Sequence, residues 1–187
     1  MKSPLSAMLL AAGLALGLSG AATANSSGDT PSGHGSGGAQ VTSKIVDAFT
    51  EFAGSPENAV SLVAGLRSGG EITLTGAGGT GTGGADTGGR DAAGKGATTT
   101  TFTSPAGPLG NGETYIALAL AKDQLAGYGV ENPTPSQIAA ALNGGTVSTS
   151  QLGDMQLQGV LQMRADGMGW GRIAQAQGTK LGWVMRG

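Results

Sequence analysis

The stretch LQGVLQMRADGMGWGRIAQAQGTKLGWV, residues 157–184, is the most regularly patterned part of the chain and decides its fold class. Two apolar runs in it keep the spacing of one helix face: Leu157, Val160, Leu161 and Arg164, then Trp170, Ile173 and Ala174. Gly167 and Gly178 follow the runs and predict helix ends, because glycine takes the left-handed conformation there without a Cβ clash. Thr179 is expected to cap a third short helix that ends near Met185.

These predicted helices are too short to be stable alone. The first is expected over residues 155–165, and all three fall below the roughly 12–15 residues at which an isolated helix becomes marginal in water. They must therefore pack against one another through their apolar faces.

The same stretch carries two resemblances. The pattern VLQMRADGMGWGRIAQAQGTKLGWV resembles a tri-helical helix-turn-helix of the resolvase or sigma-factor kind. It resembles more closely the C-terminal part of uncharacterised exported proteins of Gram-negative bacteria, which share a "QMR…GMGWG.IA" segment; this implies an exported location and a fold, but no activity.

DNA reading requires a basic recognition helix, whereas residues 179–186 offer Lys180 and Arg186 beside Trp183. We interpret the corner as a way to pack three short helices; cytoplasmic retention would revive the DNA-binding alternative.

The N-terminus has the features of a secretory signal peptide. Lys2 precedes the apolar run Ala7–Leu18, and Ala22 and Ala24 supply small residues at positions −3 and −1 of a cleavage site. A membrane anchor is the alternative, but the run is shorter than the ~20 residues that span a bilayer. We predict cleavage after Ala24, a periplasmic or secreted location, and no membrane span in the mature chain.

Composition restricts the classes of protein that the mature chain can belong to. Glycine supplies 37 of 187 residues, against a usual share of about 7%. The chain has no cysteine, so no disulfide can stabilise it. Without Lys2 the mature chain has 9 basic (10 − 1) and 12 acidic residues, a net charge of −3. We therefore expect no nucleic-acid partner, since a basic face supplies most non-specific affinity for nucleic acid.

We divide the chain into five segments around one mainly α domain with a small β-hairpin. They are a signal peptide (1–24), a disordered leader (25–40), a helical pair with a strand (41–75), a flexible Gly-rich loop (76–97), and a strand with a helical unit (98–187). His34, the only histidine, lies in the leader and is interpreted as a solvated side chain. The Gly-rich loop either closes a hairpin or separates two units.

Local signals place the elements before the C-terminal stretch. Helical spacing predicts a helix over residues 41–53, and Ser55 and Pro56 suit the N-cap and first position of a second helix that ends at Gly69. Asn58 leaves the capping box of that helix incomplete. The runs at 71–75 and 98–103 predict two antiparallel strands.

Two further helices are expected after the strands. One covers residues 113–127, and the other begins at Thr134-Pro135-Ser136-Gln137, a complete capping box. Residues 146–150 are predicted to be extended or loop. The motifs Gly110-x-Gly112 and Gly169-x-Gly171 leave open a duplicated helix pair.

Three glycine-rich patterns resemble ligand motifs but lack the required context. Residues 76–81 match GxGxxG without a following helix, and residues 89–96 approach a P-loop with Gly96 in the Ser/Thr position. Asp86 and Asp91 are too few for a calcium site. We assign no catalytic residue, no cofactor and no metal site.

The candidate site is a partner-binding surface that contains Trp170, Trp183, Arg164 and Arg172. Tryptophan and arginine are enriched where proteins bind partners, although a tryptophan is more often core. Either arginine is expected to pair with a nearby acid or to stack on Trp170.

The sequence favours a non-catalytic interaction or structural module of the cell envelope, with an unidentified envelope protein or polymer as its partner. The alternative is a small hydrolase that acts on envelope polymers. Its sign would be a pocket in which two or more of six charged residues converge: Glu113, Asp123, Asp154, Asp166, Arg164 and Arg172.

Overall fold

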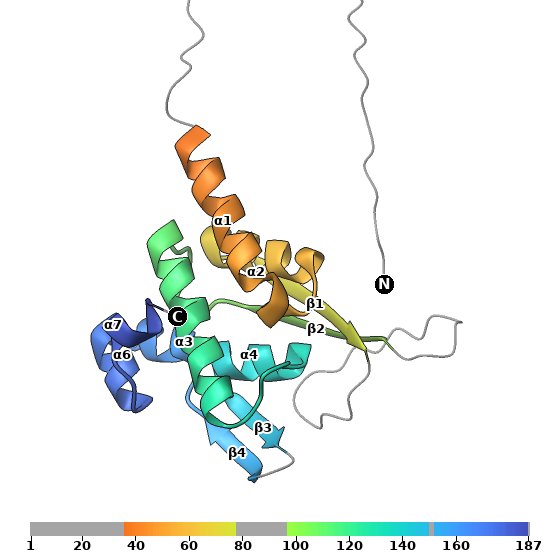
Figure 1. The fold of residues 1–187 in the computed structure, drawn as a ribbon, viewed down its shortest axis with the longest axis vertical. Coiled ribbons are helices and arrows are strands. Elements are labelled where there is room, and N and C mark those ends of the chain that lie inside the picture. The colour runs from red at the N-terminus through yellow and green to blue at the C-terminus, as the bar shows by residue number, and fades with distance from the viewer. Residues whose placement is uncertain (1–35, 78–96, 150–151, 187) are drawn as a thin grey trace, which may run out of the picture. The chain divides into compact units, whose positions relative to one another are not determined.

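The computed structural model describes residues 36–77, 97–149 and 152–186, which lie in one compact unit. Seven helices and four strands make up this described part (Figure 1): α1 (Ser36–Ala53), α2 (Pro56–Ser68), β1 (Glu71–Ala77), β2 (Ala97–Thr103), α3 (Asn111–Gly127), α4 (Pro135–Asn143), β3 (Gly145–Thr149), β4 (Gly153–Leu157), α5 (Val160–Ala165), α6 (Trp170–Ala176) and α7 (Leu181–Val184). The predicted mainly α fold with a small β-hairpin is confirmed, with a second hairpin added.

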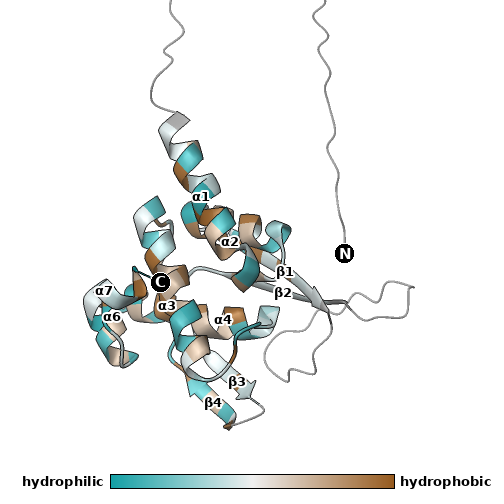
Figure 2. Cartoon of the chain, viewed as in Figure 1, coloured by the Kyte–Doolittle hydropathy of each residue, from teal (hydrophilic) through white to brown (hydrophobic). Residues whose placement is uncertain are grey.

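The strands β1 and β2 form the predicted antiparallel ribbon, with Glu71 opposite Thr103 and Ala77 opposite Ala97. Alternation divides the ribbon into two faces. Ile72 and Leu74 are fully buried on the inner face, whereas the outer face carries exposed threonines. For this reason β2 is drawn pale in the hydropathy colouring of Figure 2.

Helix α2 closes the outer edge of β1 through two polar side chains. The Asn58 amide donates to the carbonyls of Ala53 and Thr75 and accepts from the Thr75 N–H, each at 2.9 Å. The Ser61 hydroxyl accepts from the Thr73 N–H at 3.0 Å. Asn58, which leaves the capping box incomplete, therefore satisfies the backbone of a strand 17 residues away.

Helices α3 and α4 form the centre of the core. Leu118, Leu120 and Leu125 of α3 and Ile138 and Leu142 of α4 are fully buried. The capping box at Thr134 is present as predicted: the Thr134 hydroxyl accepts from the Gln137 N–H, and the Gln137 side chain accepts from the Thr134 N–H.

The predicted helix starts near residues 41 and 155 are wrong. Helix α1 begins at Ser36, inside the predicted leader, and the Thr42 and Ser43 hydroxyls donate to the carbonyls of Gly38 and Ala39 in its first turns. Residues 145–149 and 153–157 pair as the hairpin β3–β4: the first run was expected to be extended or loop, whereas the second was expected to include the start of a helix. Leu157 shares the helical spacing but is buried at the end of β4, and Gly159 becomes the N-cap of α5.

The C-terminal unit consists of α5, α6 and α7, as its glycine pattern predicts. Gly167 and Gly178 take φ values of 86° and 79° after α5 and α6. The predicted cap of α7 is one residue off: Lys180 is the N-cap and makes no side-chain capping bond.

Several predictions fall on residues outside the described ranges. They are the signal peptide, the leader up to residue 35, His34, most of the Gly-rich loop, the near P-loop at 89–96, and Asp86 and Asp91. Within the described residues, no helix is both long and apolar enough to cross a bilayer.

Candidate functional site

Glu113 is the centre of the polar cluster that joins the C-terminal unit to α3. It lies in the first turn of α3, where the Gly110 N–H donates to its Oε2 at 3.4 Å. A carboxylate is favoured at this position because the first N–H groups of a helix have no partner within it. The Gly-x-Gly start of α3 thus fixes the carboxylate in place.

Arg164 and Trp170 both approach Glu113 from the C-terminal unit. Arg164 Nη2 donates to Glu113 Oε1 at 2.8 Å in an ion pair, and Trp170 Nε1 donates to the same oxygen at 3.3 Å. The Arg164 guanidinium also stacks over the Trp170 ring, 5.0 Å from its centroid, and donates to the Met168 carbonyl at 3.2 Å. Arg164 therefore pairs with an acid and stacks on Trp170, as the sequence predicts.

Hydrogen bonds to the ionised carboxylate shift its titration. The Arg164 guanidinium lowers the pKa of Glu113 below its usual value, the Gly110 and Trp170 N–H groups add to this, and partial burial opposes it. A carboxyl group held ionised at neutral pH is a poor general acid. Because both of its oxygens already accept hydrogen bonds from the protein, the cluster is organised to join helices.

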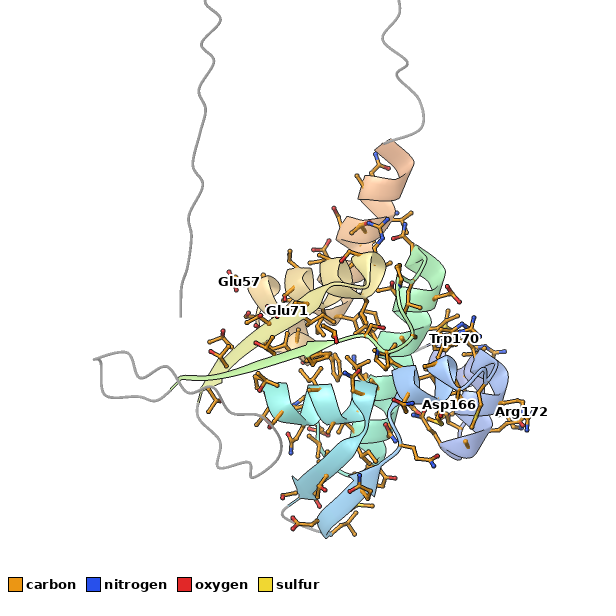
Figure 3. The ribbon with its side chains drawn as sticks, turned by 180° about the vertical axis from the view of Figure 1, so that it is seen from behind. Glu57, Glu71, Asp166, Trp170 and Arg172 are labelled. Carbon is orange, nitrogen blue, oxygen red and sulfur yellow. The ribbon has the colours of Figure 1, made fainter. Side chains whose placement is uncertain are left out.

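Arg172 and Trp183, the other two candidates, take no part in the contacts of this cluster. Arg172 is exposed and extends outward from α6 (Figure 3). Trp183 is 74% exposed, the largest value among the exposed large hydrophobic residues of the described ranges. The four candidates are therefore divided: Arg164 and Trp170 contact Glu113, whereas Arg172 and Trp183 are exposed.

Of the six charged residues that would mark an enzyme, the structure brings together Glu113 and Arg164 only. Asp154 accepts from Ser148 on the β3–β4 hairpin, and Asp166 accepts from Gln162 on α5. Asp166 lines a groove of about 410 Å³ along Gly144, Gly159 and Met168, but neither Glu113 nor Arg164 does. A second groove, of about 350 Å³, lies between the end of α3 and β3 and contains none of the six.

Charge is unevenly distributed over the described residues. Residues 170–186 carry three basic residues, Arg172, Lys180 and Arg186, and no acidic one. The other described residues carry four basic and nine acidic residues, a net charge of −5 (4 − 9). We call residues 180–186 the Trp183 segment: it presents Lys180, Trp183, Met185 and Arg186, all exposed.

The described residues bring no group of three or more His, Cys, Asp or Glu side chains close enough to hold a metal ion. Comparison with known proteins finds no match to this chain among family models, curated proteins or solved structures.

The sequence places Glu113 among six charged residues that could converge, but it does not predict that Arg164 and Trp170 share its carboxylate. Its partner Arg164 lies 51 residues away, so local spacing gives no signal for the pair. The one available signal is the Gly110-x-Gly112 start, which leaves the first turn of α3 without a side-chain cap and so favours an acid at Glu113.

Proposed function

We propose that this chain is an exported, non-catalytic interaction module of the cell envelope, and that the Trp183 segment with Arg172 is its binding surface. The observation that carries the proposal is the exposure of Trp183. A tryptophan that stabilises a small core buries much of its ring system. Trp170 is partly buried against the core, whereas Trp183 is largely exposed and contributes little to the core.

The surroundings of Trp183 support a binding role. Tryptophan and arginine are enriched among the residues that contribute most of the binding energy at protein interfaces, and residues 170–186 contain both and no acidic residue. Leu181 packs against the core and Val184 is buried, so α7 is anchored on one side while Trp183 faces outward. The exported location rests on the N-terminal sequence pattern alone.

The proposal is tested by retention of envelope components on the immobilised mature chain. Trp183→Ala is expected to abolish retention, because truncating a central tryptophan typically costs about 2 kcal/mol or more, roughly a thirtyfold loss in affinity. Leu152→Ala is the matched control, since Leu152 is also strongly exposed (59%) but lies beside the β3–β4 hairpin. Equal retention by both variants and the unmodified chain would contradict the assignment of the surface.

The hydrolase alternative has one observation in its favour, the convergence of Glu113 and Arg164. If Glu113 were catalytic, Glu113→Gln would abolish turnover of an envelope polymer while the fold persisted. On the reasoning above, that variant changes stability and its pH dependence and leaves partner retention intact.

A further inference from the structure

We infer that the Trp183 segment binds an anionic phospholipid surface, with Trp183 at the level of the headgroups and its basic neighbours on the lipid phosphates. This inference rests on the proposed function, because it names the partner class of the same surface. It requires no spanning segment, only peripheral contact.

The backbone places the cations on either side of the tryptophan. The Trp183 N–H donates to the Lys180 carbonyl at 2.8 Å, and the Arg186 N–H donates to the Trp183 carbonyl at 3.0 Å. Lys180, the N-cap residue, and Arg186, just beyond the C-cap Met185, therefore each lie three residues from Trp183, at the two ends of α7. Val184 and Leu181 hold the opposite side of α7 against the core.

The chemistry of these side chains fits the boundary between water and acyl chains. Tryptophan is enriched at membrane interfaces because one end of its ring system is apolar and the other carries an N–H. The exposed Met185 adds apolar surface beside it (41% exposed). Lys180 and Arg186, with long side chains, extend their charges toward phosphates while their methylene groups lie along the apolar boundary.

The charge pattern favours an anionic layer as the partner. The two grooves described above are lined by other residues, and the Trp183 segment contributes to neither of them. The net charge of −5 on the other described residues is repelled by an anionic layer and would turn residues 170–186 toward it.

The test uses the mature chain with vesicles that contain either one third phosphatidylglycerol in phosphatidylcholine or phosphatidylcholine alone. Co-sedimentation with the anionic vesicles is expected at 0.1 M salt and is expected to fall strongly at 1 M salt, where the Debye length shrinks from about 10 to about 3 Å. Each cation near the surface contributes about fivefold, so the double variant Lys180→Gln/Arg186→Gln should bind about 25-fold more weakly. Lys44→Gln/Lys122→Gln removes the same charge from exposed positions on α1 and α3 and should leave binding unchanged.

Fluorescence locates the contact. In Trp170→Phe, Trp183 is the only tryptophan, so its emission should shift to the blue when anionic vesicles are added. Circular dichroism of Trp170→Phe checks that the fold is kept, and sedimentation of the unmodified chain does not depend on this variant.

Each outcome separates the inference from the proposed function. Binding that is equal on neutral vesicles, equal in the two double variants, or without a blue shift would overturn the lipid inference. Dextran sulfate, a soluble anionic polymer, provides a further comparison. If the parent chain retains this polymer, Trp183→Ala does not, and no vesicle binding is seen, the lipid inference is wrong but the proposed binding surface is supported. No retention of vesicles, polymer or envelope extract would remove both.

Discussion

Replacing Gly159 with alanine is expected to destabilise the domain more than any exposed substitution in its C-terminal unit. Gly159 is the N-cap of α5, and its φ of −61° suits any residue, so the cost is purely steric. A Cβ at this position would lie 2.1 Å from both Asn143 C and Gly144 N, and 2.6 Å from Asn143 Cα. All three are backbone atoms at the end of α4, and no side-chain rotation relieves the overlap.

The size of the destabilisation depends on which residues must move to relieve the overlap. Gly144 N–H donates to the Ala140 carbonyl at 2.8 Å, which fixes the end of α4. Relief of the overlap therefore requires α5 to move away, which loosens the packing of Val160, Leu161 and Met163, all buried. Overpacking typically costs about 1–3 kcal/mol, and a clash with backbone belongs at the upper end. At roughly 2–4 °C per kcal/mol, we expect the melting temperature to fall by about 6–12 °C.

Gly171→Ala is the matched control for this measurement. Gly171 lies within α6, is exposed, and has no atom within 4 Å of an added Cβ. Alanine is favoured over glycine inside a helix by about 1 kcal/mol, so this variant should melt slightly higher than the parent. Thermal unfolding by circular dichroism compares the two. If Gly159→Ala melts at or above the temperature of Gly171→Ala, the close crossing of α4 and α5 does not exist as described.

Three other perturbations test the joints of the fold, each by urea unfolding. Because the folded pKa of Glu113 is lowered, its ion pair stabilises the fold above pH ~4.5 and loses that effect as pH falls through the folded pKa. Glu113→Gln should therefore lose about 1 kcal/mol at pH 7, because the paired side chains are 33% and 38% exposed and solvent screens them, and the gap to the parent should narrow as the pH falls below ~4.5. Asn58→Ala should cost about 2–3 kcal/mol, since it leaves the Thr75 N–H and carbonyl without their partner; a loss below 0.5 kcal/mol would show that water replaces the amide. Thr134→Ala should cost about 1 kcal/mol by removing the cap of α4, and an unchanged midpoint would contradict that role.

The sequence predicts those helices and strands whose ends are marked by local signals, such as capping residues and glycines. Ser55 and Gly69 bound α2, and the capping box at Thr134 begins α4, because the groups that start or end these helices bond to backbone only three or four residues away. The strands β1 and β2 were also predicted from the sequence, since polar and apolar residues alternate over residues 71–75 and residues 98–103 are rich in β-branched residues.

The β3–β4 hairpin shows where prediction from local sequence patterns fails. Both strands are five residues long, and Leu157 satisfies a helical spacing and a strand alternation at once. The pairing of Gly145 with Leu157 decides in favour of the strand. The spacing of residues within one segment does not report the energy of pairing with another segment. For the same reason the sequence leaves open which acid pairs with Arg164, since the Glu113–Arg164 pair depends on how α5 lies against α3.

The sequence does not show which of the two tryptophans is buried and which is exposed, and the packing of their helices decides this. Both follow a glycine turn in the same unit, and both have arginine nearby in the sequence. Trp170 begins a helix of seven residues that packs through Ile173 and Ala174, and this brings its ring under Arg164 and its N–H to Glu113. Trp183 lies on a helix of four residues, which has one buried residue, Val184, and therefore only one side to bury. Val184 and Trp183 lie about 100° apart around the helix axis, and in α7 it is Val184 that faces the core. Because Val184 holds α7 against the core, Val184→Asp should release α7 and weaken partner binding together with stability, whereas Trp183→Ala should weaken binding alone.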